Sequence, residues 1–247
     1  MKNLRVWAAL AILGVLTALP TPAAAQASRT GNTFMIGGST SPVILPDVAY
    51  DHLRDRYLVV QGNGFIEGQL LDALGNRLAV FPVTPGFLIG GYAQNPRVAY
   101  SADVNGGAGG YLVTWHETLG QIAQVRGKIV SADGAALTAD FVIALEAGVP
   151  GSGSNWTMGA AVAYSTASKE FLVTWMGGYF TSQDIRYTRV NIAGTVLQFP
   201  VAITGGPDWE RDPSVAYNPH QNEFYITYAG YLDAGGFGYV NGQSIKA

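Results

Sequence analysis

The tripeptide Val-Ala-Tyr occurs four times, as Val48-Ala49-Tyr50, Val98-Ala99-Tyr100, Val162-Ala163-Tyr164 and Val215-Ala216-Tyr217. About ten residues after each copy comes a second apolar run, at 57–60, 111–115, 171–175 and 224–228. The four tyrosines follow one another at intervals of 50, 64 and 53 residues. A period near 50 made only of short apolar runs is typical of β-propellers, in which each repeat is one small sheet.

Each repeat contains the same succession of predicted strands. In the second repeat we expect strands over residues 96–100, 111–115, 121–131 and 141–143. The first repeat gives 47–50, 57–60, 68–72 and 81–83, and the third gives 161–164, 171–175, 185–190 and 199–201. The last of these strands contains Pro82 in the first repeat and Pro200 in the third. Because proline cannot donate to a ladder, we predict that the fourth strand lies at an edge.

The fourth repeat supplies only three strands, over 214–217, 224–228 and 238–245. Its missing element has the form Phe-x-(Val/Ile), as at Phe81, Phe141 and Phe199, and this form recurs near the start of the chain as Phe34-Met35-Ile36. A strand over 32–40 would complete the last blade and remove an exposed edge. The sequence thus predicts an all-β fold: a four-bladed β-propeller with four-stranded antiparallel blades, closed by an N-terminal strand.

Two other architectures stay open. A β-sandwich has a similar number of strands, although sandwiches rarely show internal repeats of this length. A partial propeller that needs a second chain is the other, and the matching ends argue against it. In the propeller interpretation one domain spans 26–247, with blades at about 46–95, 96–158, 159–212 and 213–247, the last completed by 32–40.

The succession P-x-V-A-Y, then Y-L-V-T-W, a turn and F-x-V resembles the repeats of bacterial secreted β-propeller proteins. The resemblance covers essentially the whole chain after the first 25 residues. It implies blades around a central channel and brings no catalytic residues with it, because propellers host lectins, hydrolases and scaffolds alike. The first blade departs from the pattern at Gln61 and the fourth at Tyr228, where the other two have tryptophan.

The first 25 residues have the features of an export signal. Lys2 and Arg5 precede an apolar run over 6–19, and Ala23-Ala24-Ala25 gives a small-residue cleavage pattern. The run is shorter than the roughly 20 apolar residues that a membrane-spanning helix needs. We therefore expect a secreted or periplasmic protein with no stable membrane insertion after the signal is removed.

Composition narrows the classes of partner. The formal net charge is −3, only 13% of residues are charged, and no lysine or arginine cluster occurs, so we expect no nucleic-acid partner. There is no cysteine, which removes a disulfide framework. The three histidines, His52, His116 and His220, are dispersed without metal-ligand spacing, so neither a metal nor another cofactor is expected.

The loops expected on one face of the ring collect aromatic residues beside carboxylates. The predicted ligand-binding residues are His116, Glu117, Trp156, Tyr179, Trp209, Tyr231 and Asp233. Aromatic rings with polar neighbours stack on sugar faces at low entropic cost, whereas the alternative is that each ring simply packs between blades. Trp115, Trp175 and the four repeat tyrosines recur with the motif, so we assign them to packing between blades.

These observations favour a non-catalytic binding module whose partner is a carbohydrate or cell-surface polymer. A protein-interaction scaffold is one alternative. The other is a glycoside-acting enzyme that uses Glu117 with Asp208, Glu210 or Asp233. Hydrolysis of a glycosidic bond needs two suitably spaced carboxyl groups, and solvated loop acids are the commoner explanation of such residues.

Overall fold

The computed structural model describes Ile36 and residues 45–247, except 86–90, 120–121, 148–159, 180–181, 207 and 232–237. The predicted export signal lies outside the described residues, and so does the proposed closing strand over 32–40 apart from Ile36. In the described part of the chain all regular structure is β, except for the short 3₁₀ helix η1 (Val104–Gly107). The all-β prediction is confirmed.

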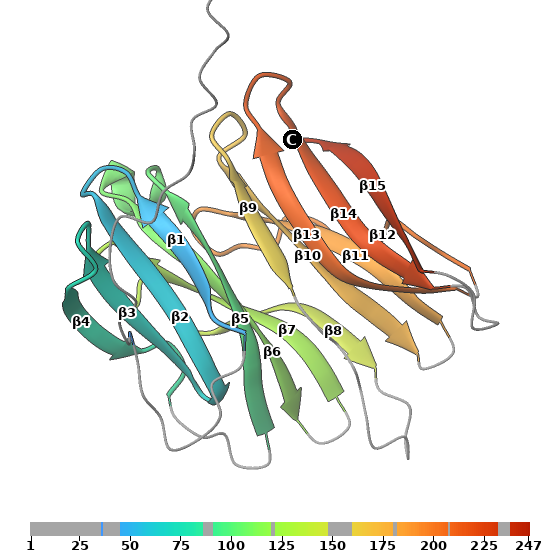
Figure 1. The fold of residues 1–247 in the computed structure, drawn as a ribbon, viewed down its shortest axis with the longest axis horizontal. Coiled ribbons are helices and arrows are strands. Elements are labelled where there is room, and N and C mark those ends of the chain that lie inside the picture. Colours follow the sequence, from blue (N-terminus) through green and yellow to red (C-terminus); the bar gives the residue numbers. More distant parts are fainter. Residues whose placement is uncertain are drawn as a thin grey trace, which may run out of the picture. The chain divides into compact units, whose positions relative to one another are not determined.

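The strands form four consecutive units in chain order (Figure 1). The first unit comprises β1 (Asp47–Asp51), β2 (Arg56–Gly64), β3 (Ile66–Asp72) and β4 (Arg77–Pro82). The second comprises β5 (Gly91–Ser101), β6 (Gly110–Leu119), β7 (Ile122–Ser131) and β8 (Phe141–Ala147). The third comprises β9 (Ala161–Ser165), β10 (Glu170–Tyr179), β11 (Ser182–Asn191) and β12 (Val201–Ala202). The fourth comprises β13 (Trp209–Asn218), β14 (Glu223–Tyr231) and β15 (Gly238–Lys246).

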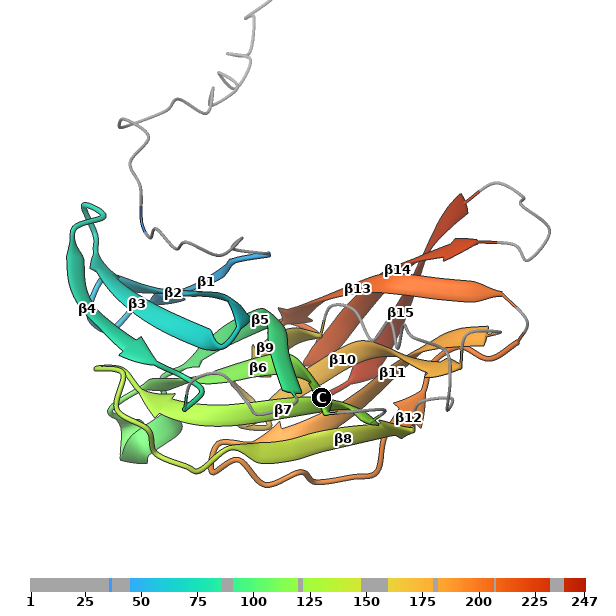
Figure 2. The ribbon, with the colours of Figure 1, turned by 90° about the horizontal axis from the view of Figure 1, so that it is seen from below.

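Neighbouring strands within each unit pair antiparallel, as the repeat predicts. The units are nevertheless not four separate blades. The end of β2 pairs with β5 at Asn63 and Gly64, and β11 pairs with β13 in parallel at Gln183 and Trp209. These contacts merge the units into an eight-stranded and a seven-stranded sheet. No strand pairing joins the two sheets among the described residues, so a closed four-bladed ring is not shown (Figures 1 and 2).

The fourth strand of the first unit lies at an edge, as its proline predicts. β4 ends at Pro82 and pairs only with β3 among the described strands. In the third unit Pro200 comes directly before the two-residue β12, which pairs only with β11. Both prolines therefore stand where no further strand needs their missing N–H group.

The two motif tryptophans pack between units, which confirms their structural assignment. Trp115 is fully buried in a cluster with Leu58 and Val60 of the first unit. Trp175 is fully buried in a cluster with Leu112 and Val125 of the second unit. Because residues along a strand alternate between faces, the second and third units each pack one apolar face against the unit before and the other against the unit after.

The residue after each Val-Ala-Tyr caps the turn that follows. A side-chain oxygen there accepts an N–H bond from the main chain two or three residues later, at Asp51, Ser101, Ser165 and Asn218. Such Asx- and Ser/Thr-turns fix the chain reversal between first and second strands. All four copies use the same device, so the repeat extends from the apolar runs to the turn chemistry.

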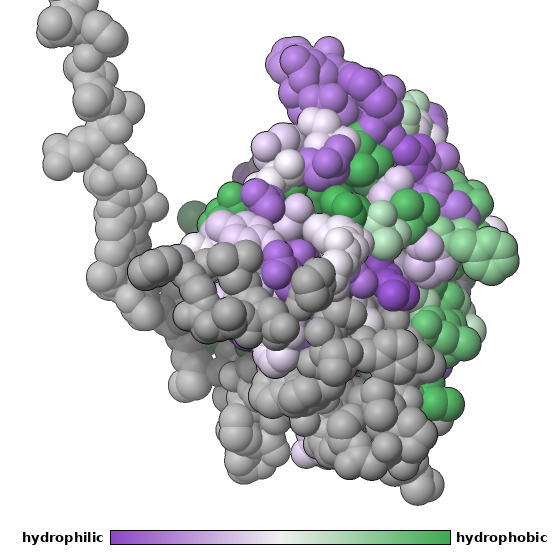
Figure 3. Space-filling view, turned by 90° about the vertical axis from the view of Figure 1, so that its right-hand side faces the viewer, coloured by the Kyte–Doolittle hydropathy of each residue, from purple (hydrophilic) through white to green (hydrophobic). Residues whose placement is uncertain are grey.

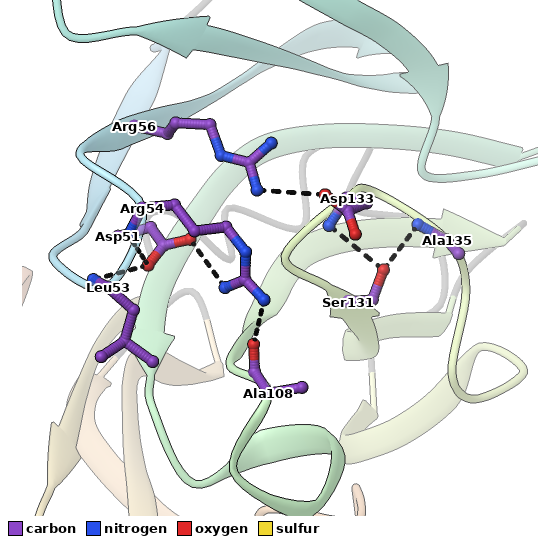
Figure 4. Close-up of polar contacts among 8 residues, drawn as sticks. All are labelled: Asp51, Leu53, Arg54, Arg56, Ala108, Ser131, Asp133 and Ala135. Atoms are coloured by element: carbon purple, nitrogen blue, oxygen red, sulfur yellow. Dashed lines mark hydrogen bonds and ion pairs between the residues drawn. The ribbon is translucent and has the colours of Figure 1, made fainter.

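Polar contacts join the first unit to the second (Figure 4). Arg54 forms an ion pair with Asp51 at 3.2 Å, and its other terminal nitrogen donates to the Ala108 carbonyl at 2.6 Å. Arg56 reaches Asp133 in the β7–β8 turn at 3.0 Å. The turns of one unit are thus held by side chains from its neighbour.

The phenylalanine of the fourth strand covers a turn glycine in the next unit. The Phe81 ring lies against Gly134, and the Phe141 ring lies against Gly194, so that neither glycine has room for a Cβ. Both glycines have positive φ angles of 86° and 84°, which also favour glycine there. Phe199 holds the same place in the third unit but is 92% exposed.

Figure 3 shows one face of the molecule, with hydrophilic residues gathered at its upper end and hydrophobic residues exposed along its right-hand edge.

The first strand of every unit lines one cavity. Its volume is about 490 Å³, and its wall includes Asp47 of β1, Arg97 of β5, Ala161 of β9 and Ser214 of β13. A shared central space is what a propeller-like series of units produces. The first strands of the four units thus share one cavity, and a closed four-bladed propeller around it stays a prediction.

Candidate functional site

The predicted site residues divide between the interior, the surface and the undescribed part of the chain. Trp156 and Asp233 lie outside the described residues, and Tyr179 is placed in β10 without a described side chain. The other four, His116, Glu117, Trp209 and Tyr231, lie on β6, β13 and β14. These four do not form one shared surface.

His116 lies in the interior rather than on a ligand face. It is 1% exposed, and it shares a strand face with Leu112, which packs against the third unit. Burial lowers the pKa of its imidazole to about 4. Neither ring nitrogen has a hydrogen-bond partner among the described residues, so the side chain is an uncharged core group.

Glu117 is also buried, and its carboxylate contacts three donor side chains. It is 5% exposed. Gln124 Nε2 donates to Oε1 at 2.8 Å, Trp115 Nε1 donates to Oε2 at 3.4 Å, and Arg126 Nε lies 3.5 Å from Oε2. A buried carboxylate with amide, indole and guanidinium partners is a structural anchor, because both of its oxygens are in contact with donors.

A second group of acids lies where the third unit meets the fourth. Glu210 belongs to β13 and is 6% exposed, Asp184 belongs to β11, and Asp208 directly precedes β13. Thr204 Oγ1 accepts the Ile185 N–H at 2.8 Å and donates to Glu210 Oε2 at 3.1 Å. We call Asp184, Asp208 and Glu210 the acidic cluster.

The pKa values of two members of the acidic cluster are raised. For Glu210 the main cause is burial, and the charges of Asp184 and Asp208 raise its pKa further. Burial also raises the pKa of Asp184, against a smaller opposing effect of Arg186. A buried carboxyl beside other acids holds its proton longer, which is the condition that a general acid needs.

The other face of β13 carries an aromatic and cationic group. Trp209 and Tyr231 are directly opposite each other across the β13–β14 pair. The Arg211 guanidinium carbon lies 5.6 Å from the Trp209 ring centroid and 4.7 Å from that of Tyr231. The predicted site residues Trp209 and Tyr231 are therefore brought together, with Arg211 as a third member.

The sequence analysis assigned Trp209 to a loop, and this was wrong. β13 begins at Trp209, so alternation sends Glu210 to one face and Trp209 with Arg211 to the other. The signal that could have revealed the strand is the alternation in residues 208–211. Acidic residues at 208 and 210 alternate with a tryptophan at 209 and an arginine at 211. A register shift between Arg211 and Ser214 then ends this segment of regular pairing.

Among the described residues, no set of three or more histidine, aspartate or glutamate side chains is arranged to hold a metal ion. No helix in the described part of the chain is long and apolar enough to span a membrane.

No protein-family model and no curated protein matches this chain. Among solved structures, an N-acetylgalactosamine deacetylase from F. plautii, in complex with blood group B trisaccharide, matches with a TM-score of 0.51 and 14% identity over 83% of this chain and 66% of that one. A protein of unknown function from Bacteroides caccae matches with a TM-score of 0.41 and 13% identity over 81% and 60%. This chain thus spans less than two thirds of the length of either protein.

An exo-1,5-α-L-arabinanase from a bovine ruminal metagenomic library matches with a TM-score of 0.46 and 12% identity, over 82% of this chain and 70% of that one. At 14% identity and a TM-score of 0.51, the likeness to the deacetylase shows a similar fold and nothing more. The deacetylase match corrects the main functional prediction, a non-catalytic binding module, because the named protein that shares the fold is an enzyme. The likeness to bacterial secreted propeller repeats stays a prediction.

Proposed function

We propose that this protein is a glycoside-acting enzyme whose reacting groups are the carboxyls of the acidic cluster. One observation carries the proposal: Glu210 is buried beside Asp184 and Asp208. Its burial and the charges of these two acids raise its pKa. The deacetylase that shares the fold acts on a sugar, which supports a glycan as the substrate. Glu117, the other acid considered from sequence, is engaged by three partners and is not part of the proposed site.

In this proposal Glu210 is the general acid and Asp208 the general base. Glu210 gives its proton to the glycosidic oxygen as the bond to the sugar carbon breaks, and Asp208 takes a proton from the attacking water. Thr204 orients the Glu210 carboxyl through its 3.1 Å hydrogen bond. The Tyr239 hydroxyl orients Asp208 by donating to Oδ2 at 3.3 Å. Asp184 acts through Glu210 by favouring its protonated form.

The test is hydrolysis of a panel of aryl glycosides and plant and host oligosaccharides, followed by release of reducing ends. We expect at least one substrate to be cleaved, with Glu210→Gln lowering kcat by about 10²–10⁴-fold, which is the usual contribution of a general acid. Glu223→Gln is the matched control, since Glu223 pairs with Lys246 on the surface. Cleavage of no substrate, or full activity in Glu210→Gln, would contradict the proposal.

We further propose that the protein is exported, to the periplasm or the medium, with residues 1–25 removed. The support is the charged start, apolar run and small-residue site in the sequence. N-terminal sequencing of the protein recovered outside the inner membrane should begin at Gln26. Recovery of an uncleaved chain from the cytoplasm would contradict export.

A further inference from the structure

The arrangement around Arg211 differs from that of the arginines that stabilise the fold. Arg54, Arg56 and Arg126 each lie within 3.5 Å of a carboxylate, at 3.2, 3.0 and 3.5 Å. Arg211 has no carboxylate partner among the described residues. Its buried Nε also has no hydrogen-bond partner there, a feature that it shares with Arg56 and Arg126. Its described contacts are the faces of two aromatic rings. A guanidinium held this way keeps donors available for an anion.

The two rings offer partly exposed apolar surface next to this cation. Tyr231 is 42% exposed, and Trp209 and Arg211 are half-buried. Stacking against two rings fixes the plane of the guanidinium and so lowers the entropy that a ligand must remove on binding. The group therefore combines a preorganised planar donor with surfaces suited to a sugar ring.

The second unit shows that the fold does not require this cation. Tyr92 and Thr118 are directly opposite each other in the β5–β6 pair, as Trp209 and Tyr231 are in the β13–β14 pair. Gln94, two residues after Tyr92, holds the position of Arg211. An uncharged glutamine thus occupies the equivalent position in the second unit. The fold does not need a charge at this position, so the charge of Arg211 points to a ligand.

We propose that Arg211, with Trp209 and Tyr231, is a subsite for an acidic sugar, a hexuronate unit whose planar carboxylate is bound by the guanidinium. A carboxylate matches the two-donor edge of a guanidinium bidentately, and charge-assisted pairs of this kind are among the stronger hydrogen bonds. A neutral sugar would leave the cation without a partner. The rings bind the face of the same sugar unit.

This subsite rests on the proposed function in one respect: the sugar bound at Arg211 is taken to belong to the glycan that the acidic cluster cleaves. Glu210 lies between Trp209 and Arg211 in sequence but belongs to the opposite face of β13. A glycan that crosses the end of this strand would present an acidic unit to Arg211 and the bond to be cleaved to the acidic cluster. Binding of the acidic sugar can be measured separately from cleavage.

The experiment is a calorimetric or NMR titration of the full-length protein with trisaccharides of galacturonate, glucuronate and mannuronate. Each is compared with its carboxyl-reduced counterpart, which has the same backbone without the charge, and with a sulfated neutral trisaccharide. We expect at least one uronate to bind at least tenfold more tightly than its reduced form. Arg211→Met should remove that preference, and Arg211→Lys should restore part of it, since a point charge cannot reproduce the bidentate contact. Gln94→Met is the matched control in the second unit.

Equal binding of acid and reduced forms by the wild type would overturn the subsite, as would a preference that survives in Arg211→Met. Stronger binding of the sulfated sugar than of every uronate would overturn the carboxylate assignment. The two proposals fail separately: uronate binding that depends on Arg211 without any cleavage contradicts the enzyme alone. Cleavage of neutral glycans without acid preference contradicts the subsite alone.

Discussion

The second and fourth units each contain a buried glutamate, Glu117 in the eight-stranded sheet and Glu210 in the seven-stranded sheet, and the two differ in their partners. Glu117 is 5% exposed and has amide, indole and guanidinium partners. Glu210 is 6% exposed, has one hydroxyl partner, and lies beside two other acids. Burial is nearly equal, so it cannot distinguish them. The partners distinguish them: Glu117 is held by three partners and stabilises the fold, whereas burial and the neighbouring acids raise the pKa of Glu210.

The largest effects should come from removing the carboxylate of each of the two glutamates. Glu210→Gln should lower glycoside hydrolysis by about 10²–10⁴-fold while leaving stability equal or higher, since it removes a carboxylate from like charges. Glu117→Ala should instead cost about 3 kcal/mol of unfolding free energy, because Arg126 is left without its carboxylate. Urea denaturation and initial rates on one preparation would check both. The reverse pattern would break the comparison.

His116 predicts a dependence of stability on pH. Its folded pKa of about 4 lies below the ordinary value of 6.5. The unfolded chain therefore binds the proton more readily, so stability is complete above the ordinary histidine range and declines as pH falls toward 4. The maximum loss is about 3 kcal/mol at roughly 1.4 kcal/mol per pKa unit.

Unfolding free energies of wild type and His116→Leu between pH 7 and 4 would measure this contribution. The variant should lose less stability than the wild type over that range. Parallel pH curves would show that His116 titrates equally in the folded and unfolded states.

A smaller difference is expected between two phenylalanines in equivalent places. Phe141 packs on Gly194 and against the core between the second and third units, whereas Phe199 is 92% exposed. Phe141→Ala should cost about 2 kcal/mol, reduced from the range for a fully buried ring because Phe141 is partly exposed. Phe199→Ala should change stability by less than about 0.5 kcal/mol. Equal losses in thermal or urea unfolding would mean that Phe199 is covered in solution.

The sequence alone predicted the features that depend on the alternation of residues within one repeat. Strand order within each unit, the edge position of Pro82 and the packing of Trp115 and Trp175 all follow from alternation and turn residues that recur with the repeat. Ring closure depends on contacts between distant ends, and the repeat alone did not establish it.

The site was harder to predict because it depends on where strands extend beyond their apolar runs. β6 continues to Leu119, so Glu117 is a buried strand residue rather than a loop acid. β13 begins at Trp209, so one short segment supplies an acid to one face and an aromatic–cation group to the other. Neither extension contains the apolar alternation from which a strand is recognised.

The most direct measurement is the titration of the glutamate side-chain carbons by NMR in the wild type and in Asp184→Asn. The account predicts that the pKa of Glu210 lies above the ordinary glutamate value, and that removing the Asp184 charge lowers it. A Glu210 that titrates at the ordinary glutamate value, unaffected by Asp184→Asn, would contradict the claim that its neighbours prepare it to donate a proton.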